Sequence, residues 1–379
     1  MTGKEARDEI LKSLRKRSEV NEPNSINFFH GRIKHFLPDS DPHVMWTCKQ
    51  EPRSRKSSKW LTATEFTDQR RILFEKTQIL VKLIKSSNRT VLYTGAGIST
   101  SAGVRQSALG LHGRGYEGRG YKGRGYQTNA KPNFSNLALT ALVNAGFIHD
   151  WVQTNYDGLA QKSGCPQEFL NEIRGSWYDP SNPPLGKKGQ PRTDLFKRMN
   201  DSAELADLTL CLGSSLTEGL TRNVANVPAQ KSLTGECLGL VIVNLQQTPM
   251  DGMATLRIFS DLDVFLHILC KMLGVTVPSK EPTVRVDLIN QSIQVPYNTS
   301  GNFSKTEITT LNLSPGQKIY MQGGGRGRVV RYCCTQQAWE LEIEGKKMLL
   351  GFWWISAAKR GGPEFLPVFN VDSNGGCHK

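Results

Sequence analysis

The sequence predicts an α/β fold, a Rossmann-like doubly wound parallel sheet, followed by a small C-terminal β module. Between residues 65 and 275, strand-length apolar runs alternate with amphipathic segments of helical length, as in a parallel sheet covered by helices. A glycine-rich turn directly follows the first of these strands, as in sheets that bind nucleotides. Beyond residue 316, apolar and polar residues alternate with the period of short half-buried strands. The 379 residues are enough for one substantial core and one smaller module.

The elements of the main domain, residues 65–275, are visible as periodic segments. Apolar positions recur at helical spacing from Phe66 to Ile84, which predicts a helix. Short apolar or β-branched runs predict strands at 89–93, 149–153, 207–212 and 240–245. A helix over 135–145 is expected between the first two strands, and a closing helix over 261–273 is expected to end at Gly274.

Two regions outside this domain differ from it in composition. Residues 1–64 combine a charged helical pattern with a basic cluster between Lys49 and Lys59, which predicts a loosely ordered basic extension. The cluster is compatible with a nuclear address, although short basic runs also arise by chance. The polar residues 276–315 predict a linker.

The C-terminal module is expected over residues 316–370. Alternation predicts four strands, at 319–322, 328–332, 339–343 and 348–354, which could close into a small barrel. Glu344-Gly345 suits the turn between the last two strands. This module could bind a peptide or nucleic acid, but a stabilising or spacing role is the default interpretation, because nothing in it is chemically specific.

A five-residue repeat of Gly, Arg and Tyr, GRGYEGRGYKGRGY, occupies residues 113–126. It contains no aliphatic residue, so we expect a loop without a core of its own. Its Tyr and Arg side chains could stack on nucleic-acid bases or dock a protein partner. The alternative is an expanded surface loop that has no function.

Composition limits the compartment and the metal content. The formal net charge is +14 and the pI is about 9.4, which permits an acidic partner without specifying one. No apolar run approaches the ~18 residues of a membrane span, and no signal-peptide core is present. We therefore expect an intracellular protein, nuclear or cytoplasmic, without a membrane partner. The 8 cysteines form no CxxC pair, which predicts reduced thiols and no structural metal.

The turn after the first strand reads Thr94-Gly95-Ala96-Gly97-Ile98-Ser99. Two glycines allow a tight turn and a close approach of the backbone to a ligand, and amides at a helix N-terminus suit a pyrophosphate. Alone the signal is weak, because the third glycine expected at position 100 is Thr100.

Four motifs in register give this turn a context. TGAGIST, NYDGL, GSSL and IVNLQ begin at Thr94, Asn155, Gly213 and Ile242. In this order and spacing the chain resembles the sirtuin family of NAD-dependent protein deacylases over residues 65–274. CLGSSL, IVNLQ and TPMDGMATLRI are most similar to the nuclear sirtuins that modify chromatin. NEIRGSWYDPSNP is similar to a zinc-less protist branch, which implies a sirtuin-type fold that lacks the small zinc lobe.

The resemblance implies NAD as the cofactor and assigns residues to it. It places the ADP-ribose part on the glycine turn and the GSS segment, that is on Gly95, Ala96, Gly97, Ser99, Gly213, Ser214 and Ser215. Asn244, after a strand, can reach a ribose hydroxyl. Asn155 and Asp157 match the family's Asn and Asp beside the nicotinamide ribose, so they are the expected catalytic residues. The alternative for the glycines and asparagines is plain turn formation.

The departures from the family concern catalysis. Residues 104–108 replace the Pro-Asp-Phe-Arg segment that covers nicotinamide in sirtuins, and Thr154 stands at the family's Gln, for which Gln153 could substitute. Arg174 occupies the place of the catalytic histidine, which takes a proton from a ribose hydroxyl. A guanidinium has no free lone pair, so Arg174 cannot serve as that base.

Loss of the general base at position 174 is expected to lower the rate by about 10² to 10⁴. The zinc ligands of the family are also missing. No cysteine lies between residues 176 and 209, where most sirtuins carry their zinc ligands, so a shorter loop is expected there. His112 and His149 are conceivable replacement bases, but lone histidines are usually structural.

Three functions remain open. The first is a sirtuin-lineage NAD-dependent deacylase of an acyl-lysine protein, with acyl transfer to ADP-ribose weak or lost. The second is a non-catalytic NAD or ADP-ribose binding scaffold, in which Arg174 holds a phosphate or an acidic group. The third is NAD hydrolysis or ADP-ribosyl transfer through Asn155 and Asp157.

Overall fold

The computed structural model describes most of the chain and divides it into two compact units. The described residues are 3–19, 29–33, 36, 38–47, 64–104, 130–183, 191–217, 219–280, 292–298, 302–304, 306–321, 325–334, 336, 338–361 and 368–370. The first unit comprises Met1–Cys165, Phe169–Arg174 and Lys187–Glu281, and the second comprises Pro166–Glu168, Gly175–Gly186 and Pro282–Lys379. The repeat at 113–126, His112 and the basic cluster at 49–59 lie outside the described residues.

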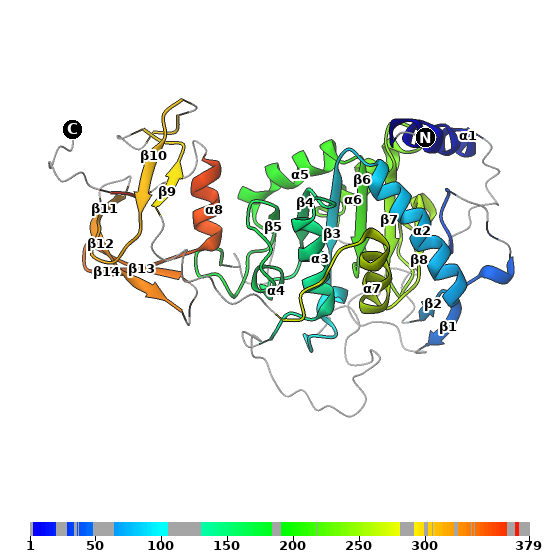
Figure 1. Ribbon diagram of the computed structural model, residues 1–379, viewed down its shortest axis with the longest axis horizontal. Helices are drawn as coiled ribbons and strands as arrows, with labels where there is room; N and C mark the ends of the chain where they lie inside the picture. The colour runs from blue at the N-terminus through cyan, green and yellow to red at the C-terminus, as the bar shows by residue number, and fades with distance from the viewer. Residues whose placement is uncertain are drawn as a thin grey trace. The chain divides into compact units, whose positions relative to one another are not determined.

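The first unit contains a six-stranded parallel sheet in the order β5-β4-β3-β6-β7-β8 (Figure 1). The strands are β3 (Thr90–Thr94), β4 (Asp150–Gln153), β5 (Leu170–Glu172), β6 (Leu208–Leu212), β7 (Gly239–Val243) and β8 (Leu256–Ile258). Every neighbouring pair is parallel. The strand order reverses direction between β3 and β6, as it does in doubly wound sheets. The predicted Rossmann-like sheet is confirmed.

Helices cover this sheet and complete its core. They are α2 (Arg70–Ser86), α3 (Phe134–Asn144), α4 (Leu159–Lys162), α5 (Phe196–Leu205), α6 (Asn223–Lys231) and α7 (Leu262–Leu273). α2 and α3 both pack against α7, and α5 packs against α6. Asp261 caps α7 by accepting the N–H of Asp263 and Val264, and Gly274 ends it at φ +72°, so the predicted helix is confirmed. None of the described helices has the length and apolarity to cross a membrane.

The N-terminal region is more ordered than the sequence suggested. Helix α1 (Gly3–Glu19) buries Leu14 completely, and Ile10 and Leu11 pack against the main core. Arg7 of this helix forms an ion pair with Asp207 at 2.8 Å. The short helix η1 (Pro38–Ser40) follows, and β1 (His43–Trp46) pairs antiparallel with β2 (Glu65–Thr67). Where it is described, the expected loose extension is therefore part of the first unit.

The second unit is built on a five-stranded antiparallel sheet. Its order is β14-β13-β12-β11-β15, with β11 (Lys318–Met321), β12 (Gly325–Cys333), β13 (Ala338–Ile343), β14 (Lys346–Gly351) and β15 (Val368–Asn370). The turn between β13 and β14 has positive φ at Glu344 (+49°) and Gly345 (+73°), as a tight hairpin requires. Among the described residues β14 and β15 are edge strands, so the sheet is open and the barrel expectation is corrected.

Two further assignments in this unit change. Residues 276–315, expected as a linker, contain the strand pair β9 (Ser292–Val295) and β10 (Thr309–Asn312). Their Ile293, Val295 and Leu311 are buried in the second core. Residues 352–354, expected as strand, begin helix α8 (Phe352–Arg360). Isolated alternation over four residues was too short to distinguish these strands from a linker.

Candidate functional site

The predicted site residues lie at one edge of the parallel sheet. The turns after β3, β4, β6 and β7 carry them, and the carboxyl ends of parallel strands meet at the same edge. The edge therefore brings together Gly95, Ala96, Gly97, Ser99, Asn155, Asp157, Gly213, Ser214, Ser215 and Asn244. The point where the strand order reverses, between β3 and β6, is where open α/β sheets bind their ligands.

The glycines of this edge hold two turns against each other. The Gly97 N–H donates to the Gly213 carbonyl at 2.8 Å, and the Gly95 N–H donates to the Leu212 carbonyl at 3.2 Å. A Cβ on Gly97 would lie 2.6 Å from the Cα of Gly213, and Gly213 itself has a φ of +58°. The two turns consequently tolerate no side chain at this crossing. The N–H groups of Gly95 and Gly97 bond within the protein, so they are not the free phosphate donors that the sequence suggested.

Ser99, Asn155 and Asp157 form one hydrogen-bonded group. The Ser99 hydroxyl donates to Asp157 Oδ2 at 2.6 Å. Asn155 Nδ2 donates both to the Ser99 hydroxyl at 3.0 Å and to the Gly95 carbonyl at 3.1 Å. The loop after β4 is thereby tied to the glycine turn after β3.

Asp157 is buried within this group. Burial raises the pKa of its carboxyl, while hydrogen bonds from the Ser99 hydroxyl and the Leu159 N–H work in the opposite direction. The Leu159 N–H donates to Asp157 Oδ1 at 3.0 Å, so both carboxyl oxygens accept a bond. The carboxyl consequently fixes the position of Ser99 and, through it, of Asn155.

Gln153, the last residue of β4, has a side-chain amide whose oxygen is hydrogen-bonded and whose nitrogen has no described partner. The Thr94 hydroxyl donates to Gln153 Oε1 at 2.7 Å, and Trp151 Nε1 donates to the Thr94 hydroxyl at 2.7 Å. The Gln153 side chain is 1% exposed, and its Nε2 has no partner among the described residues. A buried amide N–H without a partner is costly, which makes Nε2 a candidate donor to a bound molecule. Thr154, at the family's Gln position, instead donates its hydroxyl to the Thr94 carbonyl.

The turns after β6 and β7 present a hydroxyl and an amide oxygen. Asn244 Nδ2 donates to the carbonyls of Ser214 and Gln246, at 3.4 and 3.2 Å, and its Oδ1 has no partner in the described structure. The Ser214 hydroxyl oxygen accepts the Leu216 N–H at 3.3 Å. Leu216 is buried with φ at +52°, a conformation that non-glycine residues rarely adopt. Such backbone strain is concentrated at functional sites.

A buried arginine supports the turn that carries Asn244. Arg257 Nε donates to Asp251 Oδ1 at 2.9 Å, and its Nη atoms donate to the carbonyls of Asn244 (3.0 Å) and Gln246 (2.6 Å). Its Cζ lies 3.6 Å from the centroid of the Phe259 ring. Burial lowers the pKa of this guanidinium, and Asp251 opposes that shift. Asp251 and Arg257 both belong to the motif TPMDGMATLRI, whose resemblance to the family gave no sign that the two residues pair.

Arg174 lies beside the loop that carries Asn155 and Asp157. Its guanidinium carbon is 5.9 Å from the centroid of the Tyr156 ring, within the range of a cation–π contact. Tyr156 stands between Asn155 and Asp157 in the chain, so Arg174 contacts the loop that carries these two predicted catalytic residues.

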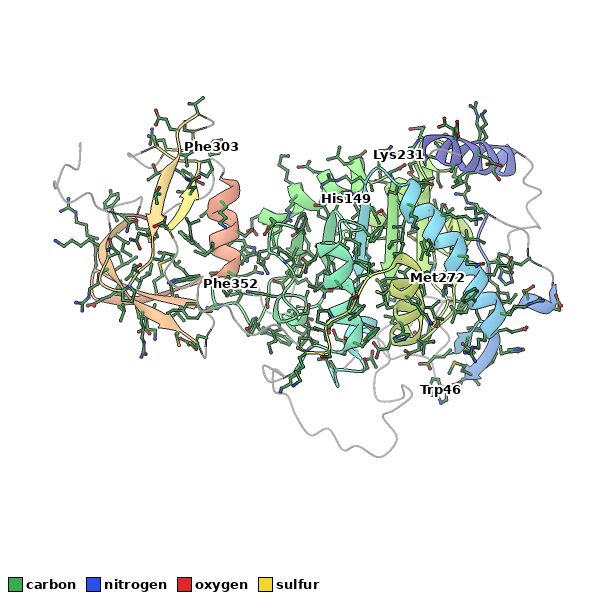
Figure 2. The ribbon with its side chains drawn as sticks, viewed as in Figure 1. Trp46, His149, Lys231, Met272, Phe303 and Phe352 are labelled. Atoms are coloured by element: carbon green, nitrogen blue, oxygen red, sulfur yellow. The ribbon has the colours of Figure 1, made fainter. Side chains whose placement is uncertain are left out.

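His149, one of the two alternative histidines, lies at the opposite edge of the sheet. His149 Nδ1 accepts the Thr90 N–H at 3.1 Å, at the amino ends of β3 and β4. The four residues of β4 separate that edge from the site by roughly 13 Å. His149 (Figure 2) is therefore not the replacement base, and His112 lies outside the described residues. No group of three or more His, Cys, Asp or Glu side chains in the described part of the chain could hold a metal ion.

Comparison with known proteins gives relatives of one kind. No protein-family model matches the chain. NAD-dependent protein deacetylase Sirt6 of Drosophila melanogaster is 31% identical over 265 residues, which cover 58% of this chain and 81% of that protein. NAD-dependent protein deacetylase SRT1 of Arabidopsis thaliana is 30% identical over 265 residues, 59% of this chain but only 54% of the plant protein. A solved structure described as "The Structural basis for Sirtuin Substrate affinity" is 24% identical and covers 53% of this chain and 99% of that chain, with a TM-score of 0.44.

Proposed function

The chain belongs to the sirtuin family, and from this premise we propose that it binds NAD through the ADP-ribose part while deacylating lysine very slowly or not at all. The observation that carries the proposal is the contrast at one sheet edge. Ser99, Asn155 and Asp157 form a hydrogen-bonded group there. Arg174, which the resemblance aligns with the family's catalytic histidine, contacts the Tyr156 ring in the same loop.

The residues present fit NAD. Gln153 Nε2 is a buried N–H donor without a described partner, and Asn244 Oδ1 is an acceptor without one. The Ser214 hydroxyl can donate, because its oxygen already accepts the Leu216 N–H and no described group takes its proton. Phosphate and ribose oxygens accept such donors, and a ribose hydroxyl donates to an oxygen such as Asn244 Oδ1. NAD would supply the electrophilic ribose carbon.

The chemistry of Arg174 supports the second half of the proposal. Its guanidinium stays protonated at every physiological pH and has no lone pair with which to accept a ribose hydroxyl proton. Loss of a general base lowers rates by about 10² to 10⁴. A charged arginine over Tyr156 instead suits an anion, such as a phosphate or a carboxylate.

Calorimetric titration with NAD and, separately, with ADP-ribose tests the binding half. We expect both to bind one site per chain. Incubation of the same protein with NAD and an acetyl-lysine peptide, followed by mass spectrometry of the peptide, tests the other half. We expect no deacetylated peptide above a no-protein blank. Robust deacetylation would contradict the proposal, and failure of both ligands to bind would show that the cofactor site has decayed.

A second candidate, NAD hydrolysis or ADP-ribosyl transfer, is favoured by one observation. Ser99, Asn155 and Asp157 remain connected although the family's base is absent. Cleavage of the nicotinamide bond needs a polarised ribose and an acceptor, and it does not need deprotonation of the ribose by histidine. Release of labelled nicotinamide without an acyl-lysine peptide would support this candidate, and Asn155→Ala should abolish the release.

A further inference from the structure

An open strand edge in the second unit carries an inference that is independent of the NAD site. β14 is the last strand of its sheet and pairs antiparallel with β13. No other strand pairs with β14 among the described residues. An edge strand presents backbone N–H and C=O groups that can pair with another extended chain.

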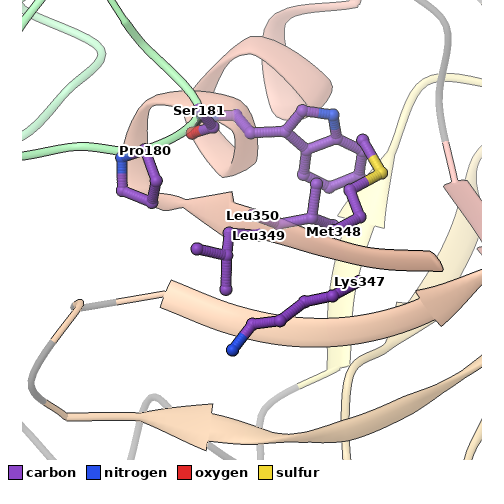
Figure 3. A pocket seen from close by; sticks show the side chains of 7 residues that line it. Pro180, Ser181, Lys347, Met348, Leu349 and Leu350 are labelled. Atoms are coloured by element: carbon purple, nitrogen blue, oxygen red, sulfur yellow. Dashed lines mark hydrogen bonds between the residues drawn. The ribbon is translucent and has the colours of Figure 1, made fainter.

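A groove lies against this edge. A cavity of about 560 Å³ is lined by residues 347–350, which are four consecutive residues of β14, together with Pro180, Ser181 and Trp354 (Figure 3). All of these residues belong to the second unit. Most of the lining is apolar: Leu350 and Trp354 are buried, whereas Met348 and Leu349 are half-buried. A groove of this kind beside a free edge is the geometry of strand addition, where backbone bonds supply affinity and side-chain pockets supply selectivity.

We propose that this groove binds an extended segment of a partner protein as an added strand, with a carboxylate opposite Lys347 and apolar side chains against Leu349, Leu350 and Trp354. Lys347 and Leu349 alternate with Met348 and Leu350 along β14, so the two sets face opposite sides of the strand. A bound strand follows the same alternation. The bound strand therefore needs an acidic residue opposite Lys347 and apolar residues at its other positions.

The charges at the edge favour this occupant over a second copy of the chain. Lys346 and Lys347 are both exposed at the start of β14, and edge lysines oppose pairing with an identical edge. Lys347 contacts Glu340 at 3.0 Å but keeps 52% of its side chain exposed, so it can also meet a partner's carboxylate.

Ion pairs within the sheet also favour a peptide over nucleic acid. Arg328 is paired with Glu342 at 2.7 Å, and Arg331 is paired with Glu340 at 3.3 Å. The neighbouring arginines are thus occupied by carboxylates and offer little charge to the row of phosphates in a nucleic acid, whereas the proposed peptide needs only Lys347. The groove itself is mainly apolar and contains one lysine.

Fluorescence anisotropy with the full-length protein tests the proposal. The probes are two fluorescein-labelled, valine-rich octapeptides that differ at one central position, which is glutamate in one peptide and lysine in the other. We expect the glutamate peptide to bind at least tenfold more tightly than the lysine peptide. Lys347→Glu should weaken the glutamate peptide at least tenfold and should bind the lysine peptide more tightly than the native protein does.

Two further variants locate the site. Lys318→Glu makes the same charge change at an exposed residue of β11, outside the groove, and should alter the affinity less than twofold. Leu349→Gln, which keeps the charge, should weaken binding at least fivefold. Unchanged melting temperatures for Lys347→Glu and Leu349→Gln would show that folding is intact. If either variant unfolds, the preference of the native protein for the glutamate peptide over the lysine peptide still tests the proposal.

Three results would overturn the proposal. The first is no binding of either peptide at millimolar concentration. The second is equal weakening by Lys347→Glu and Lys318→Glu, which would indicate general charge attraction. The third is a single-stranded oligonucleotide that displaces the peptide and loses affinity in Lys347→Glu, which would assign the groove to nucleic acid.

Discussion

The carboxylate of Asp179 accepts a hydrogen bond from the backbone N–H of Trp353 at 2.9 Å, although 174 residues separate them in the chain. Ser181 acts beside it, since its hydroxyl accepts the N–H of Gly351 at 3.0 Å. Gly351 and Trp353 stand at the start of α8, where N–H groups have no partner within the helix. The loop that follows Arg174 thus caps a helix of the second unit.

Replacement of Asp179 should destabilise the second unit. Asp179→Ala removes the acceptor for Trp353 and for the Ser181 N–H and hydroxyl, so we expect a loss of about 1 to 2 kcal/mol in the free energy of unfolding. Urea unfolding followed by tryptophan fluorescence measures this loss. Asp201→Ala, which removes an exposed carboxylate paired with Lys197 on α5, is the control and should change stability by less than about 0.5 kcal/mol. Equal effects of the two substitutions would show that the cap contributes nothing.

Gly97 should tolerate no side chain. In Gly97→Ala the new Cβ would lie 2.6 Å from the Cα of Gly213, so one of the two turns must move. We expect a lower melting temperature and loss of ADP-ribose binding, measured by differential scanning fluorimetry and calorimetry. Gly219→Ala is the matched control, because nothing lies within 4 Å of its Cβ position. Unimpaired ADP-ribose binding by Gly97→Ala would show that the contact between the turns does not shape the site.

Gly97 and Gly213 show which features of the site could be predicted from the sequence and which could not. The glycine-rich turn, the GSS segment and the alternation of strands and helices were all predictable, because strand–turn–helix patterns and motif spacing are local properties. The physical reason for Gly97 was not, since its constraint comes from Gly213, which is more than 100 residues away. A sequence motif identifies a requirement for glycine without revealing which contact imposes it.

Elements defined by long-range contacts were the ones missed. β5 and β8 are three residues each, too short to show a period, and they are strands because β4 and β7 pair with them. The loop after Gly175 uses turn chemistry, since the Ser181 N–H and hydroxyl both donate to Asp179. Its association with α8 depends on a contact that no local pattern encodes.

Arg257 and Asp251 should behave as one unit. Arg257→Met would leave the buried Asp251 carboxylate without its cation and release the carbonyls of Asn244 and Gln246. We expect a loss of about 3 to 5 kcal/mol in unfolding free energy, as for other broken buried ion pairs. The double substitution Asp251→Asn with Arg257→Met should cost less than the sum of the two single changes, measured in one urea series. Additive effects would contradict the coupling.

Lys76 should make a contribution to stability that increases with pH. Burial lowers the pKa of its ammonium from 10.5 to about 8, although Asp68 at 2.7 Å opposes the shift. Because the unfolded chain then binds this proton more tightly than the folded chain, the contribution of Lys76 increases between pH 8 and pH 10.5 and is lost as the pH falls through 8. Burial raises the pKa of the Cys211, Cys237 and Cys270 thiols in the same unit, so these groups act in the opposite direction above pH 9. Lys76 is therefore tested by a difference: between urea midpoints at pH 7.5 and 9.5, Lys76→Met should lose more stability than the native protein, whereas Lys197→Met, at an exposed lysine, should match the native protein.

Arg174→His should restore little deacylation. A histidine at this position could accept a proton at neutral pH, but the segment at 104–108 that replaces the family's nicotinamide cover would be unchanged. We therefore expect ADP-ribose binding within threefold of the native protein and less than tenfold more deacetylated peptide than the blank, measured by calorimetry and mass spectrometry. Arg174→Gln is the control, because it removes the same charge from beside Tyr156 without adding a base. If Arg174→His alone produced rapid deacetylation and Arg174→Gln did not, the missing histidine would be the sole defect, and the divergent segment would have no part in the loss.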